Sequence, residues 1–354
     1  MSPRADLTLR EYTVRVLIPF GVAALFIGLI TLLYTGSGVL ALAFVGILVA
    51  VLLRTVAERL ASWLHLSPNW TLALLLTAAT AALVLGNWYL ASSAMRQWDD
   101  FLQTIEASWK HAVGELNRHA WGRKLFEFSR DSTFTGDGIV ISKLGWFLSS
   151  GLGAAVDLFV IVFIGVYLAA DPETYRRGML HLIPPRSRGR GDEVICALAH
   201  TLRRWLVGRI VNMAIIGVLT AIGLSLLGMP VVAALSFLAF LCDFVPYVGP
   251  IIAAVPALLI AFTQADGITT ALYVALLYFG VQMVESYLVQ PLIQSRAVQM
   301  PPALLLTSQL LLGAMLGVPG IIIATPLTVV VMVLVKELYV GDALGDAGIG
   351  RATD

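Results

Sequence analysis

Most of this sequence consists of apolar stretches about as long as a bilayer is thick. Hydrophobic residues make up 58% of the chain and charged residues only 13%, too few to cover a soluble globule of 354 residues. The sequence therefore predicts an all-α fold, a polytopic transmembrane helical bundle. Each of the following stretches can cross the roughly 30 Å hydrocarbon core as one helix of about 20 residues: 16–34, 39–53 with some extension, 70–91, 146–169, 209–227 and 268–290.

Two further apolar regions, 231–262 and 303–335, are interrupted in the middle by Pro and Gly, so each half is shorter than a comfortable span. If Pro and Gly only kink ordinary short spans, the interruptions carry no site. If each region enters and leaves the membrane on one side, the interruptions place unpaired backbone deep inside it. The interrupting residues are Pro246, Tyr247, Val248, Gly249 and Pro250 in the first region, and Gly317, Val318, Pro319 and Gly320 in the second.

The two interrupted regions belong to an internal repeat. A shift of 70 residues lays 248–256 over 318–326 without a gap, and it lays Asn212 over Gln282. Each copy, 209–267 and 268–340, is then one full helix followed by one broken helical hairpin. Such a copy crosses the membrane an odd number of times, so the second copy is inverted. Inverted repeats with interrupted helices are typical of transport sites.

The distribution of charge predicts the orientation. The connection within 146–208 that follows the fourth span carries seven Arg against four acidic residues, whereas 92–145 balances seven basic with seven acidic residues. Because cytoplasmic loops are enriched in Lys and Arg, we expect the first connection inside and the second outside. Residues 1–91 then form the first three spans, and both termini, including the tail 341–354, are cytoplasmic. The expected location is the inner or plasma membrane.

Two amphipathic helices are predicted outside the spans. Residues 92–145 form an external insert with apolar residues at helical spacing, which packs against the membrane surface, a neighbouring subunit or a small external subdomain of its own. Residues 192–206 form a second helix on the inner side, with Arg203 and Arg204 on its polar face, where it lies along anionic lipid.

Ionisable residues inside spans are the candidates for a mechanism, because each costs roughly 2.5 to 3.5 kcal/mol unless it faces a cavity or a partner. Asp243 precedes the first interruption, Glu285 lies between the two interruptions, and Asp157 lies midway along the fourth span. In the alternative interpretation, Glu285 binds a backbone amide or Arg296 at the inner interface. For Asp157 we favour a structural role as a hydrogen-bonding residue. The predicted substrate or ion path comprises Asp243, Glu285, Pro246, Tyr247, Gly249, Pro250, Gly317, Gly320, Asn212 and Gln282, with Ser308 and Gln309 as further polar lining or as interhelical hydrogen-bonding residues.

Several of these motifs resemble a known family. They are the stretch Phe244-Val245-Pro246-Tyr247-Val248-Gly249-Pro250, then Pro256-Ala257, and the region from Glu285 and Gln290-Pro291-Leu292-Ile293 through Pro302, Gly317 and Gly320 to Pro326. Together they resemble the autoinducer-2 exporter family of bacterial and archaeal permeases over nearly the whole chain. The resemblance implies a homo-oligomer, a pentamer, that exports the furanone autoinducer-2 or exchanges sodium and protons. This chain has Gly208-Arg209 where relatives usually carry a glycine-glutamine pair, and Ser286 where they carry Asn or Gly.

We therefore expect a membrane transporter, a permease or exporter for a small solute such as an autoinducer-2-like signal, coupled to H⁺ or Na⁺. The alternatives are a passive oligomeric channel and a Na⁺/H⁺ antiporter. The five His and two Cys lack metal-ligand spacing, no motif of a hydrolase or nucleotide-binding enzyme is present, and the formal net charge of +1 does not favour nucleic acid. The expected partners are the lipid bilayer, the solute or ion, and further copies of this chain, without a cofactor.

Overall fold

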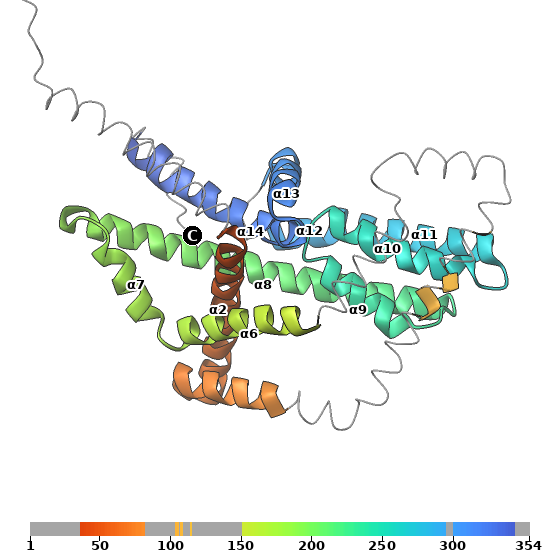
Figure 1. Ribbon diagram of the computed structural model, residues 1–354, viewed down its shortest axis with the longest axis horizontal. Coiled ribbons are helices and arrows are strands. Elements are labelled where there is room, and N and C mark those ends of the chain that lie inside the picture. The colour runs from red at the N-terminus through yellow and green to blue at the C-terminus, as the bar shows by residue number, and fades with distance from the viewer. Residues whose placement is uncertain are drawn as a thin grey trace, which may run out of the picture.

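The computed structural model describes residues 36–81, 103–105, 107–108, 114, 151–294 and 300–343. Within these residues every regular element is a helix (Figure 1), so the all-α prediction is confirmed for this part of the chain. Four helical segments of this part are long and apolar enough to cross a membrane, namely Ser37–Leu64, Pro185–Leu226, Gly267–Leu292 and Val318–Asp342. The first predicted span, most of the 92–145 insert and the end of the tail lie outside the described residues.

The first described pair of helices is α2 (Ser37–Leu64) and α6 (Gly151–Ala170), which pack closely against each other. A Cβ atom added to Gly46 of α2 would lie 2.7 Å from Ile164, and one added to Gly165 of α6 would lie 2.7 Å from Val49. Small residues at such contacts let two helix backbones approach, which is how helices associate in a membrane. A further helix covers residues 68–81, in the predicted third span.

The next helix, α7 (Pro172–His181), is capped by Asp171, whose carboxylate accepts a hydrogen bond of 3.2 Å from the backbone amide of Thr174. Hydrogen bonds from the hydroxyl and the amide of Thr174 lower the pKa of this carboxyl group. The short helix η1 (Pro185–Ser187) then leads into α8 (Arg188–Leu226).

The 39 residues of α8 form one continuous helix. The helix predicted at 192–206 is present, but it continues without a break into the predicted fifth span. Gly208 is the only helix breaker at the expected boundary, and a glycine costs about 1 kcal/mol relative to alanine inside a helix. Burial of Trp205 and Leu206 just before it, and of Met213 just after it, outweighs that cost.

The first interrupted region consists of α9 (Val232–Cys242) and α10 (Val248–Phe262), with no helix between them. The two helices pack side by side in opposite directions, with the start of α10 against the end of α9. A Cβ atom on Gly249 would lie only 1.9 Å from the carbonyl oxygen of Cys242, so glycine is required there. Tyr247 has a φ angle of 65°, which is strained for a residue with a side chain.

One helical path then runs through α11 (Gly267–Val284), the π-helical turn η2 (Glu285–Val289) and α12 (Gln290–Gln294). Pro291 explains the wide turn, because its ring lacks an N–H group and would collide with the carbonyl group four residues earlier, at Tyr287. Widening the turn before the proline relieves that collision. The side chain of Glu285 is thereby set at the start of an irregular turn, where π-helical turns are common at functional sites.

The second interrupted region consists of α13 (Pro302–Leu316) and α14 (Val318–Leu334), which continues as the π-helical segment η3 (Val335–Ala343). Here a single residue, Gly317, separates the two helices, with φ 67° and ψ −143°, a conformation open essentially to glycine alone. A Cβ atom on Gly320 would lie 2.0 Å from the carbonyl oxygen of Leu312. Both interruptions thus contain a glycine that allows close backbone contact.

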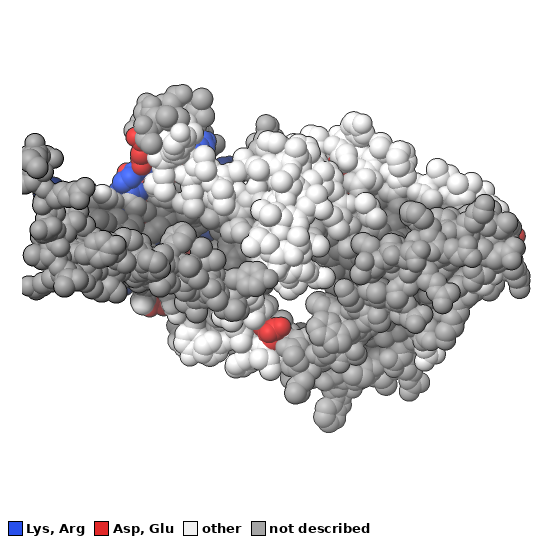
Figure 2. Space-filling model, turned by 45° about the horizontal axis from the view of Figure 1, so that its top comes forward, with Lys and Arg blue, Asp and Glu red and all other residues white. Residues whose placement is uncertain are grey.

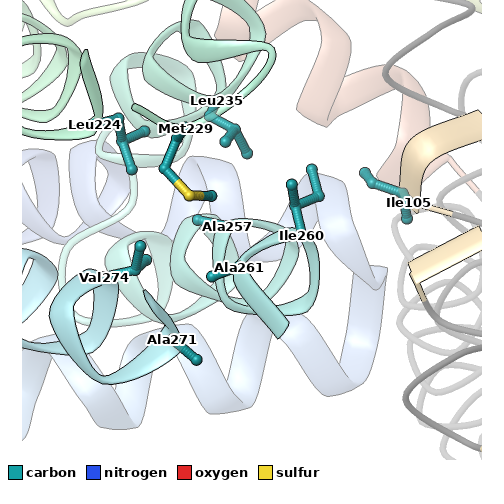
Figure 3. Close-up of a cluster of buried hydrophobic side chains, with 9 residues drawn as sticks. All are labelled: Ile105, Leu224, Met229, Leu235, Ala257, Ile260, Ala261, Ala271 and Val274. Atoms are coloured by element: carbon teal, nitrogen blue, oxygen red, sulfur yellow. The ribbon is translucent and has the colours of Figure 1, made fainter. Parts of the chain in front are cut away.

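Apolar cores lie at several levels along α8. Near its middle, Leu202, Trp205 and Leu206 pack against Leu48 of α2 and Val329 of α14. Near its end, Leu224 belongs to a cluster with α9, α10 and α11 (Figure 3). Ile105, from the predicted external insert, belongs to this cluster, and the Ser108 hydroxyl lies 3.4 Å from that of Thr263. This part of the insert therefore packs on its own chain.

The exposed surface of the described residues is largely apolar. In the face shown in Figure 2, most of the described surface is uncharged, the Lys and Arg side chains lie toward one end, and an acidic patch lies at the lower middle. Only 11% of the most apolar window of Gly267–Leu292 is buried inside the chain. Such a surface needs lipid or another protein as a cover.

Candidate functional site

Two carboxylates and two amides from distant parts of the chain meet inside the helical bundle. α8 contributes Asn212, the end of α9 contributes Asp243, and η2 contributes Glu285. The Nδ2 atom of Asn212 donates to Oδ2 of Asp243 at 2.7 Å and to Oε1 of Glu285 at 2.9 Å. Gln282 of α11 donates to Oε2 of Glu285 at 2.8 Å. Four of the sequence-predicted site residues are thus in one hydrogen-bonded group.

Arg209, one turn before Asn212 on α8, is the cation of this group. Its Nη2 atom lies 3.3 Å from Oδ1 of Asp243, and its Nη1 atom lies 3.8 Å from Oε1 of Glu285. Its Nε atom donates to the carbonyl oxygen of Phe244, in the first interruption, at 3.3 Å. The side chains of Arg209, Asp243 and Glu285 are 10%, 1% and 4% exposed, so the charges meet away from water.

The positive charge of Arg209 only partly balances the negative charges of Asp243 and Glu285. Although Nη2 of Arg209 faces Oδ1 of Asp243, neither atom makes a hydrogen bond to any described residue, and the same holds for Oδ1 of Asn212. Among the residues that the structure describes, two carboxylates against one guanidinium leave one negative charge in excess when all three are ionised. Because an unbalanced charge inside a membrane is costly, this group favours the binding of one proton or one small cation.

Gln309 of α13 connects the two interrupted regions. Its Nε2 atom donates to the carbonyl oxygen of Pro246 at 3.1 Å and lies 3.5 Å from the hydroxyl of Thr325 on α14. The first interruption therefore contacts the middle of the α13–α14 pair. The second interruption, at Gly317, lies at the end of that pair.

The remaining predicted residues fall into two groups. Tyr247, Gly249 and Pro250 lie at the interruption itself and at the start of α10, where the side chain of Tyr247 is 41% exposed. Gly317 and Gly320 shape the second interruption.

Two polar candidates lie away from the buried group. Asp157 is exposed on α6, and the Ser308 hydroxyl bonds the carbonyl oxygen of Leu305 on its own helix. The alternative partner of Glu285, Arg296, lies outside the described residues.

The importance of Arg209 was missed at the sequence level, where it was noted only as a departure from the glutamine of relatives. A signal for it existed. Arg209 and Arg296 are the only basic residues between 209 and 335, a region that contains Asp243 and Glu285. Because buried carboxylates need a nearby cation, Arg209 was one of two available candidates within this region.

Comparison with known proteins identifies the family of this chain. A family model described as "AI-2E family transporter" matches residues 22–339. The chain belongs to this family. It is therefore a membrane protein of a transporter family, in agreement with its long apolar helices.

Relatives of this AI-2E family member occur in several bacteria. "Putative transport protein YrrI" of Bacillus subtilis is 30% identical over 189 residues, which cover 52% of this chain and 53% of the relative. A transport protein of Thermotoga maritima, named in the same way, is 23% identical over 202 residues, covering 57% of this chain and 61% of the relative. The matched part of the chain thus spans little more than half the length of these two relatives.

Proposed function

We propose that this AI-2E family member is a secondary transporter that couples the movement of a small polar solute to H⁺ or Na⁺. The observation that carries this proposal is the group of Arg209, Asn212, Asp243 and Glu285, buried where the first interrupted region meets α8 and η2. Its one excess negative charge provides a place for the coupling ion, and its loosely held guanidinium can separate from the carboxylates when that ion binds.

The backbone next to this group provides the other half of the proposed site. In the interruption between α9 and α10, the carbonyl group of Phe244 accepts a bond from Arg209, and that of Pro246 accepts one from Gln309 beside one from the backbone amide of Val248. These two side chains occupy acceptors that a solute or ion would otherwise use. Discontinuous helices supply binding groups of this kind in many transporters.

The wider arrangement follows from the sequence. We propose that the two helix-plus-interruption units form an inverted repeat, with both interruptions inside the membrane and both termini in the cytoplasm. The family resemblance supports an autoinducer-2-like furanone as the exported solute, the inner or plasma membrane as the location, and a pentamer as the assembly. If the solute is a second cation, the same group makes the protein a Na⁺/H⁺ antiporter.

Transport in proteoliposomes tests the coupling. Flux of a panel of small solutes, autoinducer-2 included, is measured with and without pH and Na⁺ gradients, alongside a pH-sensitive dye inside the vesicles. Asp243→Asn and Glu285→Gln are expected to abolish gradient-driven flux, because each removes one carboxylate from the buried group. Asp157→Asn is the matched control, since that carboxylate is exposed on α6, and it should transport like the wild type.

Gel filtration and thermal unfolding establish that each variant is folded and assembled. A passive channel uses a pore lining instead of a coupling carboxylate. Unchanged flux in folded Asp243→Asn and Glu285→Gln variants would therefore support the channel and refute coupling at this site.

A further inference from the structure

The first half of α8 extends past the buried group and is held by ion pairs. At 1.5 Å per residue the 39 residues of α8 reach roughly 58 Å, about twice the thickness of the hydrocarbon core. Arg209 lies near the middle of this length. Before it, Asp192 pairs with Arg176 of α7 at 2.6 Å, and Arg203 pairs with Glu58 of α2 at 2.6 Å.

Two further ion pairs join the start of α8 to η3, which continues α14. Nε of Arg190 donates to both carboxylate oxygens of Asp342, at 3.1 and 3.0 Å, and Nη2 donates at 2.9 Å to the carboxylate and to the backbone carbonyl of Glu337. Nη1 donates to Glu193 at 2.9 Å. Bonds from one planar guanidinium to several acceptors fix its orientation as well as its position.

The two helices joined by Arg190 both lead to the candidate site. α8 carries Arg209, which lies 19 residues or roughly 28 Å along the helix from Arg190. α14 carries Thr325, beside the amide of Gln309 that bonds the carbonyl group of Pro246. Moving the end of α14 away from α8 would therefore pull on the hydrogen bond between Gln309 and the carbonyl group of Pro246.

We propose that Arg190, Glu337 and Asp342 form a latch that keeps the site closed at this end of the molecule. When the latch is broken, α14 and α13 move away from α8, Gln309 releases Pro246, and the interruption becomes accessible to water. The side chains of Arg190, Glu337 and Asp342 are 35%, 15% and 44% exposed, so water and salt reach the latch. Ion pairs in such positions are weak enough to open and close repeatedly.

Cys242 reports on this opening, because it is half-buried and adjacent to Asp243. The protein used for labelling carries the substitution Cys196→Ser, which removes the second, exposed thiol. It is placed in nanodiscs, where both membrane faces are accessible, and the rate at which a charged maleimide labels Cys242 is measured by mass spectrometry. Arg190→Gln is expected to raise this rate about fivefold or more, the size of a typical conformational coupling.

Two further variants make the test specific. Glu337→Gln combined with Asp342→Asn removes the latch from the other side and should raise the rate similarly. Arg176→Gln removes the paired Asp192 contact at the same end of α8 without touching η3, and should leave the rate unchanged. An unchanged rate in Arg190→Gln, or an equal rise in Arg176→Gln, would overturn the latch. Labelling requires no solute, so this result is independent of the transport proposal.

Discussion

At the level of single residues, the buried group joins three charges that are far apart in the sequence. Asn212 holds the two carboxylates together, and Arg209 lies against both of them without a well-formed hydrogen bond to either. The guanidinium of Arg209 supplies the positive charge of this group. Removing one member of a buried ion pair leaves the other charges uncompensated, which costs more than removing the whole pair.

This reasoning predicts a specific double-mutant cycle. Arg209→Gln should lower the free energy of unfolding by about 3 kcal/mol, because two carboxylates then remain buried without a cation. Combining it with Glu285→Gln should restore part of that loss, since the charge excess returns to one. Denaturant titrations in detergent micelles measure both effects. If the two substitutions simply add, Arg209 and Glu285 do not interact in the folded protein.

At the level of elements, the two interruptions depend on glycine for different reasons. Gly249 allows α10 to start directly against the end of α9, whereas Gly317 supplies a backbone conformation that other residues avoid. The π-helical turn η2 depends instead on Pro291, which lies six residues after Glu285. Local sequence thus sets the backbone at each of these three places.

Two glycine-to-alanine substitutions distinguish a glycine that close packing requires from one that it does not. Gly249→Ala should lower the free energy of unfolding by about 3 kcal/mol, because its Cβ atom would lie 1.9 Å from the carbonyl oxygen of Cys242 and force the helices apart. Gly280→Ala, within α11, is the matched control, since nothing lies within 4 Å of the added Cβ atom. It should be neutral or stabilising by up to about 1 kcal/mol. Equal melting temperatures for the two variants would contradict the close contact.

At the level of the whole molecule, α8 is the element to which most others are attached. Ion pairs hold its first half to α2, α7 and η3, polar side chains hold its middle to α9 and η2, and an apolar cluster holds its end to α9, α10 and α11. Because α8 is one continuous helix, a displacement at one end also moves the groups attached to its other end. The outward faces remain apolar, as Gly267–Leu292 illustrates.

These uncovered faces bear on the proposed assembly. We expect native mass spectrometry from lipid nanodiscs or mild detergent to give a particle of five times 38.1 kDa with bound lipid. Both lipid and neighbouring copies would then cover the apolar faces. A monomer that retains coupled transport would refute the pentamer and leave lipid as the only cover.

The class of this protein and the regions where its helices are interrupted could be predicted from the sequence. Both depend on local properties: the length of apolar runs, the positions of Pro and Gly, and the rarity of charge inside a span. Asp243, Glu285, Asn212 and Gln282 were identified in this way. Three features required the folded structure: Arg209 is their cation, α8 continues unbroken past Gly208, and Gln309 contacts Pro246. The hydrogen bonds of Asn212 and Gln309 join residues 31 to 73 positions apart, and packing of helices, which no local pattern encodes, brings them together.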